Sequence, residues 1–258
     1  MALINVAYAS DELKRQVSFL AYLPIDNGLP VPEAGYRTLV MLHGLTGYDA
    51  SWIKSSDIEA LARERSLAVI FPNGENSFYV PGLAPNSDYG ALVGREILDF
   101  ARRLFPLSHR REDTFIGGVS MGGFGAIRNG LKYADTFSKV ISFSAVIHMF
   151  EFEPGDVRRH MVCHEDLVMG DFAAARETDK NPAVCLRELQ ARVKGGQARF
   201  PEINMICGTD DDLIDANRSF RDKLLTAGAP VFYEEGPGRH DMKYWNPNLP
   251  AMLDWLMD

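Results

Sequence analysis

Short apolar runs alternate with amphipathic segments along most of the chain. The runs that we interpret as strands are Thr38–Leu42, Leu67–Phe71, Thr114–Gly118, Lys139–Phe143, Ile203–Cys207 and Val231–Glu235. Apolar residues recur at helical spacing in the segments Ser56–Arg65, Leu92–Leu104, Met121–Tyr133, Ala216–Ala227 and Pro250–Met257. Continuous apolar runs are typical of strands that are buried on both faces of a parallel sheet. The alternation therefore predicts an α/β fold, with a mostly parallel central sheet and helices on both of its faces.

Two regions depart from this alternation. At the N-terminus, Ala2–Tyr8 and Gln16–Leu23 have the composition of strands, and the short polar segment between them predicts an antiparallel hairpin. Residues 146–201 carry aromatic, methionine and charged residues and predict two or three short helices without a clear core of their own. Because loops carry specificity on a rigid scaffold, we interpret them as a lid-like insertion in a single domain that spans residues 1–258.

Composition and charge narrow the class of protein. Of the 258 residues, 46% are hydrophobic, which is too large a share for a disordered chain. The net charge of −8 argues against binding to nucleic acid or to an anionic membrane surface. Three cysteines without a CxxC spacing favour a cytoplasmic location. No apolar run approaches the roughly 18–20 residues of a membrane helix, and the N-terminus lacks the basic start of a secretory signal.

A G-x-S-x-G motif stands between a predicted strand and a predicted helix. The strand Thr114–Gly118 leads into Gly118-Val119-Ser120-Met121-Gly122. In this context the serine occupies a sharp turn that exposes its hydroxyl above the sheet, and the glycines leave room for the neighbouring strand and helix. The motif predicts Ser120 as a nucleophile; the alternative is a glycine-rich turn that packs a helix onto the sheet.

A serine hydroxyl needs a base to take its proton, and the base needs an orienting acid. The α/β-hydrolase order is serine, acid, histidine. Asp210, Asp211 and Asp212 follow one late strand, and His240 follows the next. The other histidines, at positions 43, 109, 148, 160 and 164, all precede the acid, so His240 alone fits the order. The pattern does not separate the three aspartates, and a solvated helix N-terminus or a loop histidine would explain the same residues.

Backbone N–H groups must stabilise the oxyanion of a tetrahedral intermediate. One such donor follows the nucleophile, which makes it Met121, and the other comes from the loop after an early strand. Here that loop is His43-Gly44-Leu45-Thr46-Gly47, in which Leu45 N–H is the best candidate and the glycines let the backbone bend inward. An ordinary strand–helix turn is the alternative interpretation.

Taken together, these motifs carry a family resemblance. The segments concerned are Met41–Gly47 with Ser51 and Trp52, Arg111–Gly125, Ile206–Asp211 with Ala216 and Asn217, and Gly238–Asp241 with Tyr244 and Trp245. From about Phe19 to the C-terminus the chain resembles the esterase D / tributyrin esterase family of α/β-hydrolases. The resemblance implies hydrolysis of carboxylic esters with short acyl chains, and it assigns Asp211 as the acid of the triad.

The chain also departs from the family pattern. Met242 stands where the family often has a tryptophan, two residues after the histidine. The related S-formylglutathione hydrolases commonly have a histidine before the nucleophile and another after the glycine pair, where this chain has Val119 and Phe124. Val119 and Phe124 make a glutathione thioester a weaker interpretation than an oxygen ester, whereas Met242 concerns the edge of the pocket near His240.

The candidate substrate-binding residues are Gly44, Trp52, Tyr79, Phe150 and Trp245, because small-molecule pockets are mostly apolar with a few polar groups. Packing in the core is an equally good interpretation of the aromatic residues in the insertion. His160 and His164 stand at i and i+4, a zinc-binding spacing, but no third ligand follows at a fixed distance. We therefore expect neither a metal nor a cofactor.

The sequence thus predicts a serine carboxylesterase that acts on short-chain acyl esters, with a small-molecule ester as its partner. Self-association as a dimer or tetramer is a further expectation. The alternatives are an S-formylglutathione hydrolase or another thioesterase, an acyltransferase, and a ligand-binding receptor on the same fold.

Overall fold

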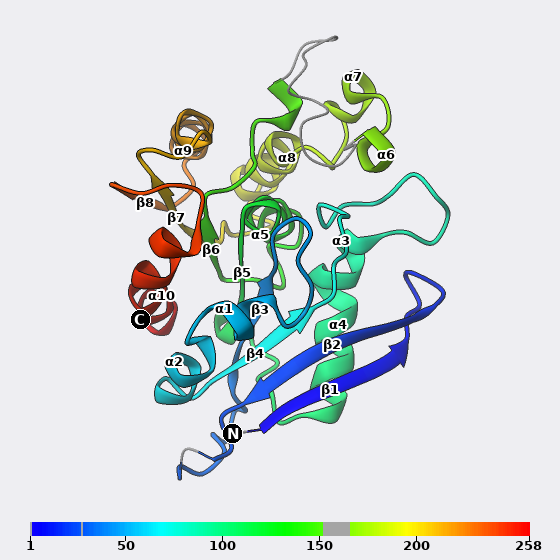
Figure 1. Ribbon diagram of the computed structural model, residues 1–258. Coiled ribbons are helices and arrows are strands. Elements are labelled where there is room, and N and C mark those ends of the chain that lie inside the picture. Colours follow the sequence, from blue (N-terminus) through cyan, green and yellow to red (C-terminus); the bar gives the residue numbers. More distant parts are fainter. Residues whose placement is uncertain (1, 27, 152–165) are drawn as a thin grey trace.

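An eight-stranded sheet organises the protein, in the order β1-β2-β4-β3-β5-β6-β7-β8 (Figure 1). The computed structural model describes residues 2–26, 28–151 and 166–258. The strands are β1 (Ala2–Ala9), β2 (Gln16–Leu23), β3 (Arg37–Leu42), β4 (Leu67–Pro72), β5 (Thr114–Val119), β6 (Lys139–Phe143), β7 (Glu202–Gly208) and β8 (Val231–Gly236). β1 runs antiparallel to β2, and β2 antiparallel to β4, while every other neighbouring pair is parallel. The predicted α/β-hydrolase fold with its N-terminal hairpin is therefore confirmed.

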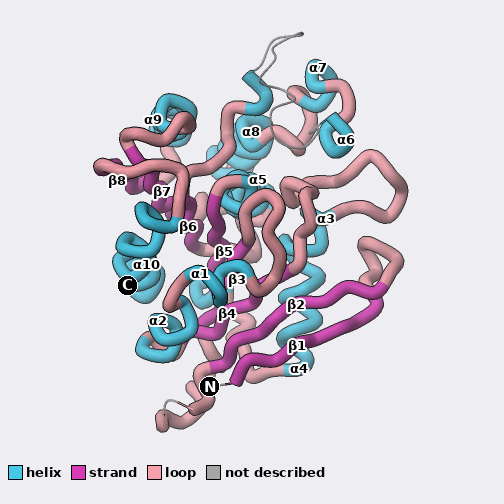
Figure 2. Tube along the Cα trace, in the orientation of Figure 1, coloured by secondary structure: helices cyan, strands magenta, loops and turns pink. Residues whose placement is uncertain are grey.

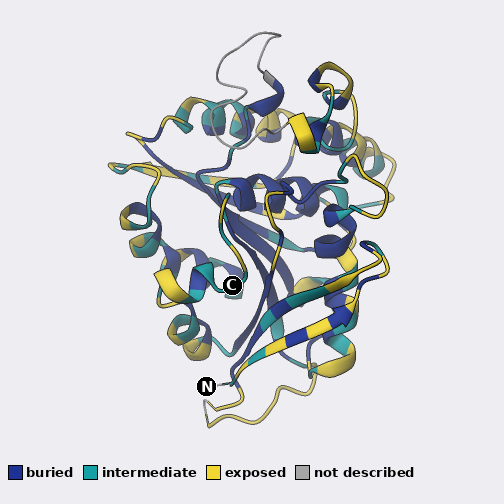
Figure 3. Cartoon of the chain, turned by 45° about the vertical axis from the view of Figure 1, so that its right-hand side comes forward, coloured by how far each residue is buried: buried dark blue, intermediate teal, exposed yellow. Residues whose placement is uncertain are grey.

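Successive residues of the central strands are buried on opposite faces of the sheet. Val40 of β3 and Ile116 of β5 belong to one apolar core, whereas Leu39 and Phe115 belong to the other. This alternation is the ordinary side-chain period of a strand, and it shows why these strands are apolar at every position. Figure 3 shows the contrast with β1, whose exposed and buried residues alternate at the edge of the sheet.

Helices cover both faces of the sheet (Figure 2). The α-helices are α1 (Ser51–Ser55), α2 (Ile58–Glu64), α3 (Tyr89–Ala91), α4 (Ile97–Leu104), α5 (Met121–Lys132), α6 (Asp166–Met169), α7 (Phe172–Ala175), α8 (Pro182–Lys194), α9 (Ile214–Ala227) and α10 (Met242–Met257). A π-helical turn, Leu92–Glu96, joins α3 to α4, and short 3₁₀ helices occupy Arg111–Asp113 and Met149–Glu151. Of the described helices, none has the length and apolar character that crossing a membrane requires.

The last helix begins eight residues earlier than the sequence predicts. Prolines are unfavourable inside helices, so Pro247 and Pro250 suggested a start at Pro250. In the structure, the Asp241 side chain accepts hydrogen bonds from the N–H groups of Lys243 and Tyr244, and this N-terminal cap starts α10 at Met242. α10 consequently starts two residues after His240 and fixes the chain on that side of it.

The described part of the insertion packs on the main body of the protein. α6 and α7 are short, as predicted, but α8 has 13 residues, and Leu186 and Leu189 on it belong to the same core as the sheet. The fully buried Arg128 of α5 binds Asp179 through both the backbone carbonyl, at 2.8 Å, and the carboxylate, at 3.0 Å. Residues 152–165, on which much of the lid interpretation depends, lie outside the described part of the chain.

Candidate active site

Ser120 occupies the sharp turn between β5 and α5. Its backbone has φ 58° and ψ −115°, a left-handed conformation that costs energy for a residue with a side chain. Its N–H donates to the carbonyl of Phe143 at 2.9 Å, and its own carbonyl accepts from Phe124 N–H at 3.0 Å. These bonds to β6 and α5 hold the turn in place, so the hydroxyl has a defined position above the sheet.

The two motif glycines allow this turn because the chain passes too close for a side chain. A Cβ atom on Gly118 would lie 2.4 Å from the carbonyl oxygen of Gly122. A Cβ atom on Gly122 would lie 2.5 Å from the carbonyl oxygen of Leu42, at the end of β3. Both distances are shorter than any tolerable contact, so the spacing of the motif follows from packing between β3, β5 and α5.

The structure brings His240 between Ser120 and Asp211. His240 Nε2 lies 2.9 Å from Ser120 Oγ, and His240 Nδ1 lies 2.9 Å from Asp211 Oδ2. Because the carboxylate accepts the Nδ1 proton, Nε2 is left as the acceptor for the serine hydroxyl. The His240 side chain is 36% exposed and that of Asp211 is 0% exposed, so the imidazole reaches the solvent while the carboxylate is buried.

Burial and hydrogen bonding distinguish Asp211 from its two neighbours. Asp210 and Asp212 are exposed, whereas Asp211 lies behind the turn that follows β7. Its second oxygen, Oδ1, accepts the N–H of Leu213 at 2.9 Å. Desolvation raises the pKa of Asp211, but the hydrogen bonds from His240 and Leu213 outweigh it and leave the pKa below the usual value. Asp211 is thus charged at neutral pH, as an acid that orients a histidine must be.

The loop after β3 is fastened by a second, buried histidine. His43 Nδ1 lies 2.8 Å from the carbonyl of Gly44, and Nε2 accepts the N–H of Gly74 at 2.9 Å. Burial lowers the pKa of His43, so this imidazole is neutral and carries its proton on Nδ1. The Tyr79 hydroxyl donates to the His43 carbonyl at 3.0 Å, and the Thr46 N–H donates to Asn76 Oδ1 at 2.8 Å.

The two predicted oxyanion donors, Met121 and Leu45, belong to two segments that adjoin Ser120. Met121 is the first residue of α5, and the first N–H groups of a helix have no acceptor within it. Leu45 follows Gly44, where an added Cβ would lie 3.5 Å from the Cβ of Ser120. The β3 loop therefore passes directly beside Ser120.

The predicted pocket residues have different surroundings. Trp52 is 2% exposed and its Nε1 donates to the Leu42 carbonyl at 2.9 Å, while Tyr79 is 0% exposed and holds His43. These two aromatics support the β3 loop from the interior, and we no longer expect them to touch a substrate. Phe150 packs against Phe124 of α5, and the Trp245 ring packs against that of His240, with centroids 4.9 Å apart.

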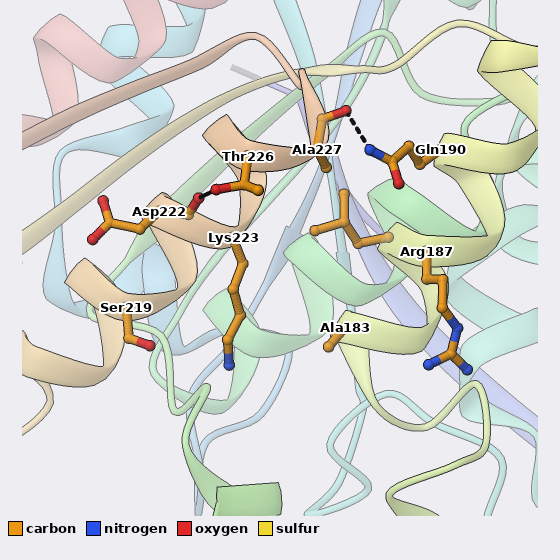
Figure 4. Close-up of a pocket in the computed structure, with 9 residues that line it drawn as sticks. Ala183, Arg187, Gln190, Ser219, Asp222, Lys223, Thr226 and Ala227 are labelled. Carbon is orange, nitrogen blue, oxygen red and sulfur yellow. Dashed lines mark hydrogen bonds between the residues drawn. The ribbon is translucent and has the colours of Figure 1, made fainter.

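Two hollows lie near the described part of the insertion. A groove of about 570 Å³ separates α8 from α9 (Figure 4). A smaller cavity of about 290 Å³ shares Ala183 and Lys223 with it. The groove is lined by Ala183, Leu186, Arg187, Gln190, Ser219, Asp222, Lys223, Thr226 and Ala227. Ser120, Asp211 and His240 line neither hollow, so both lie apart from the candidate triad.

Within residues 2–26, 28–151 and 166–258, no three histidine, cysteine, aspartate or glutamate side chains form a group that could hold a metal ion. His160 and His164, with the zinc-binding spacing, lie outside these residues.

Known proteins resemble this chain over almost its whole length. The family model described as "Putative esterase" matches residues 10–256. An acetyl esterase of Caldicellulosiruptor saccharolyticus is 36% identical over 265 aligned residues, which cover 99% of this chain and 98% of that protein.

Solved structures of two staphylococcal hydrolases have the same fold as this chain. The fluorophosphonate-binding serine hydrolase F of Staphylococcus aureus superposes with a TM-score of 0.83 and 30% identity, covering 100% of this chain and 98% of that chain. The S-formylglutathione hydrolase of the same organism superposes with a TM-score of 0.81 and 29% identity, covering 100% and 99% of the two chains.

Proposed function

Since this chain belongs to the putative-esterase family and is a carboxylic ester hydrolase, we propose that it cleaves short-chain acyl esters with Ser120, His240 and Asp211. The observation that carries the proposal is the position of His240, whose ring nitrogens lie 2.9 Å from Ser120 Oγ and 2.9 Å from Asp211 Oδ2. A serine hydroxyl bonded to a histidine, which is in turn bonded to a buried carboxylate, is the arrangement that activates a serine as a nucleophile.

The first half of the reaction forms an acyl-enzyme. Ser120 Oγ attacks the ester carbonyl while His240 Nε2 accepts the serine proton. The imidazolium is stabilised by Asp211, which stays charged, and it then protonates the leaving alcohol. The C–O bond to the alcohol breaks, and the acyl group remains on Ser120.

The second half releases the acid. Water loses a proton to His240 Nε2 and attacks the acyl carbonyl, and Ser120 Oγ leaves with that proton. In both halves the carbonyl oxygen becomes an oxyanion, for which the N–H groups of Leu45 and Met121 are the proposed donors. Removing one such donor typically lowers kcat by about 10²–10³.

Two observations support short acyl chains. The acetyl esterase relative aligns with 99% of this chain, so the parts that contact the acyl group have counterparts there. Four residues after Ser120, Phe124 is buried and its ring packs against those of Phe78 and Phe150, an aromatic cluster that we expect to limit the length of the acyl chain.

Hydrolysis of S-formylglutathione is the second candidate function. It is favoured by the 29% identity to the staphylococcal S-formylglutathione hydrolase over the entire chain. The same triad would attack a thioester carbonyl, and the leaving group would be a thiol rather than an alcohol. The formyl group is as small as the acyl groups proposed above, so only the leaving-group side distinguishes the two functions.

The test compares p-nitrophenyl acetate, butyrate and octanoate with S-formylglutathione, using the wild type, Ser120→Ala and Ser219→Ala. We expect acetate and butyrate to be turned over fastest, and Ser120→Ala to lower kcat by a factor on the order of 10⁵–10⁶. Ser219 lies in the groove between α8 and α9, so its variant should keep wild-type rates. Turnover that survives in Ser120→Ala overturns the mechanism, and a clear preference for S-formylglutathione selects the second candidate.

A further inference from the structure

Tyr79 links the β3 loop to α5, the helix that follows Ser120. Its hydroxyl donates to the carbonyl of His43 at 3.0 Å, and its own carbonyl accepts the side-chain N–H of Asn129, on α5, at 2.9 Å. Tyr79 is 0% exposed and has a φ of 56°. A left-handed backbone persists in a residue with a side chain only where its surroundings determine it. One residue thus binds the β3 loop at one end and α5 at the other.

The Tyr79 ring is closely packed between these two elements. A Cβ atom on Gly125 of α5 would lie 2.5 Å from Tyr79 Cδ2, and one on Gly74, in the loop after β4, would lie 2.1 Å from Tyr79 Cε1. The same Gly74 donates its N–H to His43 Nε2, and the rings of Tyr79 and His43 pack edge to face, with their centroids 5.7 Å apart. A displacement of the ring would therefore displace the β3 loop or α5.

The orientation of the Asn129 amide is fixed by its partners. Arg128 Nη1 donates to Asn129 Oδ1 at 2.6 Å, and a guanidinium can only donate, so the amide oxygen faces Arg128. The Nδ2 group then donates to the carbonyls of Tyr79 and Gly125, each at 2.9 Å. Asn129 is 0% exposed, and a buried amide with its oxygen and both N–H groups bonded holds its neighbours in one arrangement.

The charged groups of this network are paired with each other. Arg128 is 0% exposed, and its guanidinium binds the carboxylate of Asp179, in the described part of the insertion, at 3.0 Å. Burial raises the pKa of the Tyr79 hydroxyl, so the phenol keeps its proton and donates it to the His43 carbonyl. The network therefore runs from Asp179 through Arg128 and Asn129 to Tyr79 and the β3 loop.

The two proposed oxyanion donors belong to the elements that Tyr79 joins. Leu45 lies two residues after His43 in the β3 loop, and Met121 is the first residue of α5. Because α5 is a continuous helix of 12 residues, a bond at Asn129 also positions Met121. Two donors stabilise one oxyanion only if both lie about 2.7–3.1 Å from it at the same time. The separation between the β3 loop and α5 therefore decides whether both can bind.

We propose that Tyr79 and Asn129 are positioning residues of the esterase reaction: together they set the separation between the N–H groups of Leu45 and Met121. This inference rests on the proposed function. Both residues are fully buried and act through the backbone that they hold rather than on the substrate. Their side-chain hydrogen bonds go to the β3 loop, to α5 and to each other rather than to the candidate triad.

The test uses Tyr79→Phe and Asn129→Ala, singly and together, with Tyr22→Phe as the matched control. Tyr79→Phe keeps the ring and removes only the hydroxyl. Tyr22 is another tyrosine of 0% exposure, on β2, and its hydroxyl has no hydrogen-bond partner among the described residues. The readouts are kcat and KM for p-nitrophenyl acetate, the pH profile of kcat/KM, and the rate of amide hydrogen exchange in a peptide that spans residues 41–48.

We expect Tyr79→Phe to lower kcat about tenfold with little change in KM, because a displaced donor costs less than the factor of about 10²–10³ for a lost one. Residues 41–48 should exchange faster, and the acidic limb of the pH profile should stay in place, since His240 keeps its partners. The double variant should be no slower than the more impaired single variant, because both substitutions interrupt the same link. Tyr22→Phe should match the wild type.

Folded Tyr79→Phe with wild-type kcat, or with wild-type exchange in residues 41–48, overturns the inference. An acidic limb that shifts together with kcat also overturns it, as does an equal effect of Tyr22→Phe. If Asn129→Ala does not fold, Tyr79→Phe decides by itself. Absence of ester turnover in the wild type would instead overturn the proposed function, and the exchange of residues 41–48 would still test the link.

Discussion

The loop after β3 and the loop after β8 each contain one histidine that is hydrogen-bonded through both ring nitrogens. The partners of His43 are backbone groups, whereas those of His240 are side chains. His43 uses both ring nitrogens on backbone groups, Gly44 carbonyl and Gly74 N–H, and is 1% exposed. His240 uses both nitrogens on side chains, Asp211 and Ser120, and its own side chain is 36% exposed. Neither ring nitrogen of His43 is hydrogen-bonded to a carboxylate, whereas Nδ1 of His240 is bonded to Asp211.

The comparison shows that the chemistry of a histidine is decided by its partners rather than by its loop. Burial lowers the pKa of His43 and keeps it neutral, which suits a residue that only holds the β3 loop beside Ser120. The other imidazole, His240, is hydrogen-bonded to a buried carboxylate, which would stabilise the imidazolium of the proposed reaction. Substituting one histidine at a time tests whether His240 acts in the reaction and His43 only supports the loop.

The largest effect is expected at the base. His240→Gln should lower kcat by a factor on the order of 10⁴–10⁶, because glutamine cannot accept the serine proton. The thermal midpoint should change little, since the side chain is partly exposed. His109→Gln, at an exposed loop position, is the control and should leave both quantities unchanged. Appreciable turnover by folded His240→Gln would contradict the assignment of the base.

For His43, which supports the β3 loop, we expect a smaller loss of activity and a larger loss of stability than for His240. His43→Gln keeps a neutral side chain but cannot reach both Gly44 and Gly74, so one buried backbone group loses its partner. This should lower the free energy of unfolding by about 1–3 kcal/mol. We expect kcat to fall about 10- to 100-fold, because the β3 loop carries a proposed oxyanion donor. Denaturant unfolding and kcat measured on the same sample check both values, and an activity loss without a stability loss would contradict a supporting role.

The smallest effect is a pH dependence of stability. The pKa of His43 is lowered below 6.5 in the folded protein, so below that pH the unfolded chain binds more protons. The stabilisation from His43 is thus complete above pH 6.5 and decreases as the pH falls toward the folded-state pKa. The difference in unfolding free energy between the wild type and His43→Gln should shrink from pH 7 to pH 5. A difference that stays constant over this range would show that His43 does not titrate as expected.

Local patterns were sufficient for most of the fold. The strands of the parallel sheet are apolar at successive positions because both of their faces are covered, and this is visible without any knowledge of the partner strands. The start of α10 was missed, because the Asp241 cap begins the helix ahead of Pro247 and Pro250, which are unfavourable inside a helix. The length of α8 was also missed, because the residues that bury it lie on α5 and α9, far away in the sequence.

The sequence by itself determined the α/β fold, the Ser120 turn and the order of acid and histidine along the chain, because each depends on residues that are close in sequence. Only the tertiary structure brought His240 within 2.9 Å of Ser120 and of Asp211, and placed Trp52 and Tyr79 in the interior. It also revealed the contacts of His43 with Gly44 and Gly74. These depend on where separate strands end relative to one another, and that is set by packing across the sheet rather than by any local pattern.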